Sequence, residues 1–225
     1  ERFLYINARE VATKNPLVTL YLGASDCLEM EVSNLASLAD GTWGPCNPSV
    51  SNWSLVTGDG RKTVYARFKT QADPQNPTDV VSANIVLDTQ AQLTAFTHDG
   101  GGRVIGAGGI LRFQLTGEPN GFAKAAIATY DSDITLYDDG TRGDALKGDG
   151  VYQRDYTITR VDDIVNANVT GYLTDALGNN ASLSAAAKVT ITVPPLVTNV
   201  QIVADLLNQS ATVSWRTDEP STGVV

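Results

Sequence analysis

Four aspartates lie close together in a glycine-rich stretch of the sequence, and their carboxylates are the groups best suited to do chemistry. They are Asp138, Asp139, Asp144 and Asp149. Calcium takes about six to eight oxygen ligands, which carboxylates and the backbone carbonyls of a flexible loop supply. The stretch therefore predicts one structural Ca²⁺. Asp138 or Asp139, not necessarily both, is expected to be a ligand, because adjacent strand residues point to opposite faces.

The main alternative to a calcium site is a set of tight turns. Aspartate and glycine are both common in turns, so these residues need no metal to explain them. The Asp-x-Asp-x-Asp-Gly order and the closing glutamate of an EF-hand are also missing. Against this, carboxylates so close together repel one another unless a cation or solvent separates them, and only Arg142 and Lys147 stand nearby in the sequence.

The composition excludes several catalytic and metal-binding chemistries. The 225 residues include one histidine, His98, and two cysteines, too few for a Cys/His zinc cluster, a multi-histidine site or a haem attachment motif. His98 opens a His-Asp-Gly-Gly-Gly run that is superficially similar to the oxyanion loop of esterases. The Gly-x-Ser-x-Gly element that would present a nucleophile is absent from the sequence. We therefore expect a turn histidine and no enzyme activity in this chain.

Charge and hydropathy argue against two kinds of partner. The formal net charge is −9, which repels a phosphate backbone, so no nucleic acid is expected to bind. No apolar stretch reaches the roughly 18 residues that a membrane-spanning helix needs. The first residues do not have the pattern of a signal peptide, so the sequence is expected to be a mature product or an excised piece of a longer protein.

The elements that must position the aspartates are β-strands. Apolar and polar residues alternate with period two at residues 17–22, 63–68 and 189–193, as in strands with one buried face. Asp-Gly, Gly-Asp-Gly and Gly-Asn turns separate the strands at short intervals. No capped helical stripe is present, although the alanine-rich residues 123–128 and 182–188 allow a short turn. The sequence predicts an all-β chain of sandwiches.

Two boundaries divide the chain into modules. One strand series ends near residue 90, and the Val-Pro-Pro-Leu-Val run at residues 193–197 is a stiff junction. The predicted modules are 1–90, 91–194 and 195–225.

A weak internal repeat links the first two modules. Residues 64–70 align with residues 169–175, so both modules are expected to be versions of one sandwich. The third module supplies two strands, which are too few for a sandwich. Either the native chain continues, or these strands take a partner from elsewhere.

Three segments resemble modules of extracellular bacterial proteins. Residues 53–69, with Trp-x-Leu, Gly-Asp-Gly and Lys-Thr-Val-Tyr, resemble the penultimate hairpin of bacterial immunoglobulin-like surface repeats. Residues 137–152 resemble the Asp-Asp-Gly-x-x-Gly-Asp-x-x-x-Gly-Asp-Gly-x-Tyr loop of immunoglobulin-like domains in secreted bacterial proteins. Residues 210–222 are similar to the early strands of fibronectin type III-like domains, including those that precede secreted metallophosphatases.

The resemblance implies tandem immunoglobulin-like β-sandwiches followed by a truncated fibronectin type III-like module, in an extracellular bacterial setting. The surface repeats usually continue with an Asp-Ala-Ala-Gly-Asn turn after the first segment. Residues 71–77 depart from that turn, whereas residues 174–179 of the second module match it.

The extracellular setting bears on the two cysteines, Cys27 and Cys46. An even number of cysteines in a secreted β protein favours a disulfide, which loop-closure entropy makes worth about 3 kcal/mol. The alternative is two free thiols. Trp43 is expected to cap the loop that the disulfide closes, whereas Trp53 and Trp215 lie in alternating segments and are expected in cores.

These features favour a non-catalytic function. The chain is expected to be a structural spacer or assembly segment of a larger extracellular bacterial surface protein, with other domains or copies of that protein as partners. A second hypothesis makes it a set of accessory domains of a secreted, phosphatase-like hydrolase whose active site lies outside this chain. A third is a carbohydrate-binding module that contacts polysaccharide through Trp43. Such modules occur in adhesins, surface layers and secreted hydrolases alike, so the fold does not decide between them.

Overall fold

The computed structural model describes residues 1–159, 163–193, 197–205 and 207–217. Within this part of the chain every regular element is a β-strand, apart from one 3-10 turn, η1 (Asn7–Arg9). The chain divides into two compact units, one made mainly of Glu1–Gln92 and the other mainly of the residues after it. The prediction of an all-β chain is confirmed. The module boundaries stay predictions, and the proline junction at residues 194–196 lies outside the described residues.

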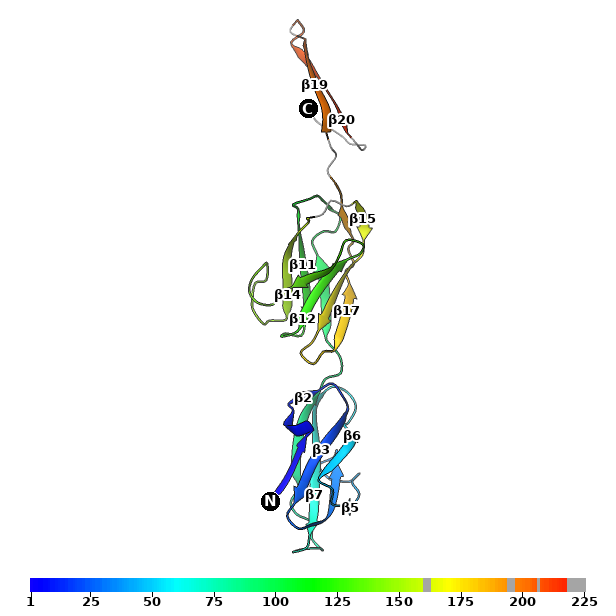
Figure 1. Ribbon diagram of the computed structural model, residues 1–225, viewed down its shortest axis with the longest axis vertical. Coiled ribbons are helices and arrows are strands. Elements are labelled where there is room, and N and C mark those ends of the chain that lie inside the picture. The colour runs from blue at the N-terminus through cyan, green and yellow to red at the C-terminus, as the bar shows by residue number, and fades with distance from the viewer. Residues whose placement is uncertain (160–162, 194–196, 206, 218–225) are drawn as a thin grey trace. The chain divides into compact units, whose positions relative to one another are not determined.

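The first unit is a sandwich of two sheets (Figure 1). One sheet has the strand order β1-β3-β6 and the other the order β2-β8-β7-β4-β5. The strands are β1 (Arg2–Ile6), β2 (Ala12–Thr13), β3 (Leu17–Ala24), β4 (Cys27–Ser33), β5 (Gly44–Pro45), β6 (Ser49–Ser54), β7 (Gly60–Thr70) and β8 (Val81–Leu87). The predicted alternation places one face of each strand in the core, which includes Val18, Leu20 and Leu22 of β3 and Val64, Ala66 and Phe68 of β7.

The described residues between 93 and 193 in the second unit form three sheets, with the orders β9-β11-β14, β13-β12-β16-β17 and β10-β18-β15. The strands are β9 (Leu93–His98), β10 (Val104–Ile105), β11 (Ile110–Gly117), β12 (Phe122–Ile127), β13 (Asp131–Leu136), β14 (Val151–Thr157), β15 (Ile164–Ala167), β16 (Val169–Thr174), β17 (Asn180–Ser184) and β18 (Val189–Ile191). The inward residues of β11 are fully buried, among them Leu111, Phe113 and Leu115.

The main sheets of the two units have the same strand order. The order β1-β3-β6 corresponds to β9-β11-β14, and β8-β7-β4-β5 corresponds to β17-β16-β12-β13. Each unit also has a two-residue strand that pairs in parallel with a late strand, β2 with β8 and β10 with β18. This division of consecutive strands between two sheets is that of an immunoglobulin-like sandwich. It explains the internal repeat, because residues 64–70 and 169–175 fall in the corresponding strands β7 and β16.

One expectation about local structure is wrong in detail. Residues 53–69 do not form a hairpin, because β6 and β7 belong to different sheets and the chain crosses between them. Residues 123–128 form most of a strand, β12, in which Ala123, Ala125 and Ile127 face the core. Alanine has the highest intrinsic helix propensity, but propensity is a weak guide, and the packing of the sandwich overrides it here.

The last two strands form a hairpin of their own. β19 (Val197–Asp205) pairs with β20 (Ser210–Thr217) in an antiparallel two-stranded sheet, as the sequence predicts. Ile202 and Val203 are each more than half exposed. Residues 218–222, the end of the fibronectin-like segment, lie outside the described residues. In the described part of the chain, no helix is both long enough and apolar enough to span a membrane.

Candidate metal centre

The acidic loop, defined as residues 138–150, joins the two main sheets of the second unit. It leaves β13 in the four-stranded sheet and returns through β14 in the three-stranded sheet; Figure 1 shows it as the yellow-green loop beside β14. At its base Tyr137 and Gln153 exchange two backbone hydrogen bonds of 2.9 and 2.8 Å. The loop is therefore closed at its stem.

Two glycines let the loop pack against its neighbours. Gly143 has φ 102°, and a Cβ there would lie 2.8 Å from the backbone nitrogen of Asp155. Gly150 has φ 78°, and a Cβ there would collide with the carbonyl oxygen of Gly117. Only glycine meets both requirements, because L side chains rarely adopt this backbone region and would have no space here.

Three of the four predicted aspartates come together in the folded loop. Asp138, Asp144 and Asp149 each place one carboxylate oxygen within 4.8 Å of the others. Asp139 is not part of this group. Its Oδ1 accepts hydrogen bonds from the amide and hydroxyl of Thr141, at 2.9 and 2.5 Å, and its Oδ2 pairs with Arg142 at 3.1 Å. The Thr141 hydroxyl, more than any other neighbour, lowers the pKa of Asp139.

The Asp138 carboxylate organises the end of the loop. Its Oδ1 accepts hydrogen bonds from the backbone amides of Gly148 and Asp149, at 2.6 and 3.1 Å, and its Oδ2 accepts one from Gly150 at 3.1 Å. These three bonds hold both ends of the loop together. A carboxylate has about four lone-pair positions, so one remains for a further partner.

Asp144 is the buried member of the group. The residue is 7% exposed, and its Oδ2 accepts a 2.6 Å hydrogen bond from the Gly140 amide. Among the buried side-chain nitrogen and oxygen atoms of the described residues, only Asp144 Oδ1 lacks a hydrogen-bond partner. An unsatisfied buried carboxylate oxygen is costly, and the sequence alone gave no sign that Asp144 is the residue that bears this cost.

The protein offers the group little positive charge. Asp149 is exposed and accepts a 2.9 Å hydrogen bond from the Val151 amide. The ion pairs of the described residues do not include Asp138, Asp144 or Asp149. Arg142, one of the two cations nearby in the sequence, pairs with Asp139 and lies against the ring of Tyr137, whose centre is 4.3 Å from its Cζ.

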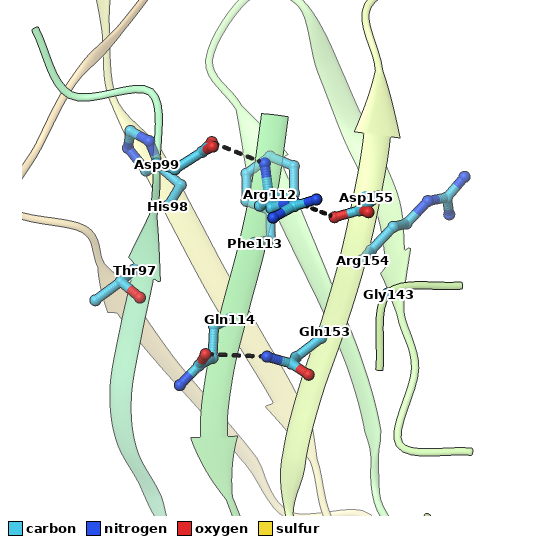
Figure 2. Close-up of a pocket in the computed structure, with 10 residues that line it drawn as sticks. All are labelled: Thr97, His98, Asp99, Arg112, Phe113, Gln114, Gly143, Gln153, Arg154 and Asp155. Carbon is cyan, nitrogen blue, oxygen red and sulfur yellow. Dashed lines mark hydrogen bonds and ion pairs between the residues drawn. The ribbon is translucent and has the colours of Figure 1, made fainter. Parts of the chain in front are cut away.

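A shallow pocket of about 540 Å³ lies next to the loop, over β9, β11 and β14. Figure 2 shows Arg112 paired with Asp155 and Gln114 paired with Gln153. Arg112 Nε lies 2.9 Å from Asp155 Oδ1, and Gln153 Nε2 donates to Gln114 Oε1 at 3.0 Å. Four of the polar side chains that line the pocket are therefore engaged with one another.

His98 lines this pocket but has no ring nitrogen free for catalysis. Its Nδ1 accepts a 3.1 Å hydrogen bond from the Gly100 amide, and its Nε2 lies 3.0 Å from the Ala187 carbonyl oxygen. Since a carbonyl only accepts, Nε2 carries the proton and donates it to Ala187. The histidine therefore holds the Gly-rich turn in place, as expected from the sequence.

The two cysteines of the first unit are joined. The Cys27–Cys46 disulfide, with a Cα–Cα distance of 6.0 Å, links the first residue of β4 to the segment after β5. It does not join the two sheets as the disulfide of antibody domains does. The disulfide joins the edge of the five-stranded sheet to the segment that follows β5.

Trp43 lies on this edge and contacts two cations that sequence reasoning missed. Its ring centre is 4.4 Å from Lys69 Nζ and 5.3 Å from Arg67 Cζ. The sequence contains the two alternating charge patterns Glu29-x-Glu31 and Arg67-x-Lys69. It does not show the register between β4 and β7 that brings these residues together. The ring is therefore engaged by the protein's own cations.

Comparisons with known proteins give only distant structural similarities. No family model and no curated protein matches the chain. Among solved structures, the fibronectin(III)-like modules of Clostridium thermocellum CbhA align with 85% of this chain and 95% of their own, at 9% identity and a TM-score of 0.35. A solved chain from a 1.5-MDa bacterial ice-binding adhesin aligns over 85% of this chain and 65% of that solved chain, at 18% identity and a TM-score of 0.41.

Domains 4 and 5 of the S-layer protein SbsC align with 86% of this chain and 97% of their own, at 12% identity and a TM-score of 0.28. Similarities this distant do not assign a function to this chain. The strand order of the two units defines it as a tandem of immunoglobulin-like β-sandwiches.

Proposed function

We propose that this chain is a non-catalytic spacer or assembly segment of a larger extracellular bacterial surface protein. The observation that carries the proposal is the repetition of one immunoglobulin-like strand order in two consecutive units. Repeated modules of this kind extend a protein without requiring an active site. The Cys27–Cys46 disulfide supports an oxidising, extracellular location, because such bonds are rare in the cytosol.

The site geometry supports a non-enzymatic role as well. The pocket beside the acidic loop contains His98 with both ring nitrogens engaged and Arg112 paired with Asp155. His98 therefore has no acceptor left to serve as the general base that would activate a nucleophile. The partners of the segment are then other domains or further copies of the same protein.

Location on the cell surface is tested on intact cells of the source bacterium. Antibodies raised against the chain should label intact cells, and brief treatment with an external protease should remove the label. Labelling that appears only after the cells are broken would contradict the proposal. A cytosolic marker protein, unaffected by the protease, is the control for cell integrity.

The carbohydrate-binding alternative is tested through Trp43. We expect no glycan binding that depends on this ring, because Lys69 and Arg67 already contact it. Binding of the wild-type chain to a polysaccharide, lost in Trp43→Ala and kept in Trp53→Phe, would replace the spacer role with a binding role. Trp53 is the matched control, since its indole nitrogen donates to Asn34 and its ring packs on the core of the same unit.

A further inference from the structure

We propose that the acidic loop binds one calcium ion through Asp138, Asp144 and Asp149. Two separate observations support the site. The three carboxylates each bring an oxygen within 4.8 Å of the others. Asp144, which is 7% exposed, brings its side chain into this group while its Oδ1 has no hydrogen-bond partner. The inference concerns one loop and does not depend on the proposed surface role.

The distances suit calcium without rearrangement of the backbone. Calcium–oxygen bonds are about 2.3 to 2.6 Å, so two ligands on opposite sides of the ion are about 4.6 to 5.2 Å apart. Oxygens within 4.8 Å of one another fit around a single ion. Asp144 Oδ1, the last free position of Asp138, and the exposed Asp149 carboxylate supply the protein ligands. Water reaches the remaining positions through the exposed side of the loop.

The charge of the group requires a positive partner. Burying an ionised carboxylate is costly unless it is paired, and the described ion pairs leave Asp138, Asp144 and Asp149 without a basic side chain. Backbone amides satisfy Asp138 and one oxygen of Asp144. These neutral donors leave the mutual repulsion of the three carboxylates largely uncompensated. A divalent cation removes it.

The ligand type selects calcium over other metals. All three ligands are carboxylate oxygens, whereas zinc and copper sites in proteins favour histidine and cysteine. Magnesium requires near-ideal octahedral coordination with metal–oxygen distances of about 2.1 Å, and it usually keeps several of its water ligands. The group here combines a buried, a half-buried and an exposed carboxylate, an irregular arrangement that the flexible coordination of calcium tolerates better.

Calcium bound here would fasten the connection between the two sheets. Asp138 follows β13 in one sheet, and Asp149 precedes β14 in the other. An ion held between them cross-links both ends of the loop. Because the ligands separate when the unit unfolds, binding stabilises the folded unit in proportion to the calcium concentration.

The experiment uses the full chain with calcium alone as the ligand. Thermal unfolding and isothermal titration calorimetry are carried out in a chelator and in calcium on the order of 1 mM, the range of extracellular sites. We expect binding of calcium to the wild type and a Tm at least about 3 °C higher with calcium than with the chelator. No binding heat, together with equal Tm values, would overturn the proposal and leave the aspartates as turn formers.

The variant Asp144→Asn separates a metal ligand from a structural residue. In the chelator its Tm should equal or exceed that of the wild type, because one of three repelling charges is removed and the Gly140 hydrogen bond can remain. Adding calcium should not raise the Tm of this variant. A purely structural aspartate would give the opposite result, a lower Tm in both buffers and an undiminished response to calcium.

Asp139→Asn is the matched control, since Asp139 lies beside Asp138 in the same loop but outside the group. It should keep the calcium-dependent rise of the wild type, whatever its Tm in the chelator. If Asp144→Asn fails to fold, Asp149→Asn, an exposed position, carries the test and should also lose the rise. Loss of the response in Asp139→Asn but not in the group variants would overturn the assignment.

Discussion

Arg67 Nε donates a 2.6 Å hydrogen bond to Glu31 Oε2 from the directly opposed position of the neighbouring strand. The Glu31 side chain is 6% exposed and that of Arg67 is 32% exposed. The next pair along the same strands, Lys69 with Glu29, is almost as short at 2.8 Å, but Glu29 is 46% exposed. Both cations also contact the Trp43 ring. The first unit thus has two ion pairs of similar geometry that differ mainly in burial.

Removing the cation of the buried pair is expected to destabilise the first unit strongly. Arg67→Met leaves the Glu31 carboxylate buried without its partner, and we expect a loss of about 2 to 3 kcal/mol in the free energy of unfolding, measured with urea. The double variant Glu31→Gln with Arg67→Met should recover much of this loss, because the uncompensated charge is gone.

Lys69→Met is the control for that prediction. It removes a cation from Trp43 in the same way, but its partner Glu29 stays hydrated. The expected loss is about 0.5 kcal/mol or less. Equal losses in the free energy of unfolding for Arg67→Met and Lys69→Met would mean that the burial of Glu31 does not determine how much stability is lost.

The disulfide is expected to stabilise the first unit even though it does not join the sheets. Replacing Cys27 and Cys46 by alanine should lower the free energy of unfolding by about 2 to 4 kcal/mol. Wild-type protein treated with a reductant should lose a similar amount, and the alanine variant should not respond to reductant at all. Peptide mapping of freshly isolated protein that finds two alkylatable thiols would contradict the bond.

The strands were predictable because their signal is local. One buried face and one solvated face produce the alternation that marks β3 and β7 in the sequence. The assignment of a strand to one sheet or the other has no local signal. For this reason residues 53–69 looked like a hairpin, although β6 and β7 lie in different sheets.

The sequence predicts that the aspartates of the acidic loop lie close together, but it does not predict which contacts each side chain makes. The spacing of aspartates and glycines placed four carboxylates in one loop, yet it could not tell that Asp139 turns toward Thr141 while Asp138 takes up three backbone amides. Adjacent residues in a loop obey no simple alternation, since each φ value redirects the next side chain. The burial of Asp144 likewise depends on contacts that only the folded unit creates.

Asp175 is expected to make its turn sensitive to acid. Burial raises the pKa of Asp175, but hydrogen bonds from Asn179 and Leu177 outweigh it and hold the pKa below the ordinary 3.8. Its Oδ1 accepts from the amides of Leu177 and Asn179, each at 2.8 Å, and its Oδ2 from the Asn179 side chain at 2.7 Å. A carboxyl with a lowered folded pKa stabilises the protein above pH 3.8 and loses that contribution as pH falls through the lowered value.

The test compares Asp175→Asn with the wild type at two pH values. At pH 7 the variant should be less stable by about 1 to 2 kcal/mol, since a charged acceptor is replaced by a neutral one. Near pH 3 the difference in the free energy of unfolding should shrink. The exposed Asp133→Asn serves as the control and should differ little from the wild type at either pH. A constant difference for Asp175→Asn would argue for loss of packing and against the titration.

Tyr156 is expected to weaken the second unit in alkaline solution. Burial and a 2.8 Å hydrogen bond from its hydroxyl to Asp131 Oδ2 raise the pKa of Tyr156 above the ordinary value of 10.0. Above pH 10 the unfolded chain therefore releases the tyrosine proton while the folded chain retains it. A raised folded pKa gives stability that is fully present below pH 10.0 and is lost as pH increases beyond it.

Tyr156→Phe cannot ionise and should lose less stability than the wild type on going from pH 8 to pH 11. At pH 8 the variant should be less stable by about 1 kcal/mol, because Asp131 loses a donor, and this difference should narrow at pH 11. Tyr172→Phe, at a position that is 39% exposed, should follow the wild type throughout. Urea unfolding at both pH values measures the differences, and parallel curves for Tyr156→Phe and the wild type would show that the Tyr156 hydroxyl titrates alike in the folded and unfolded chain.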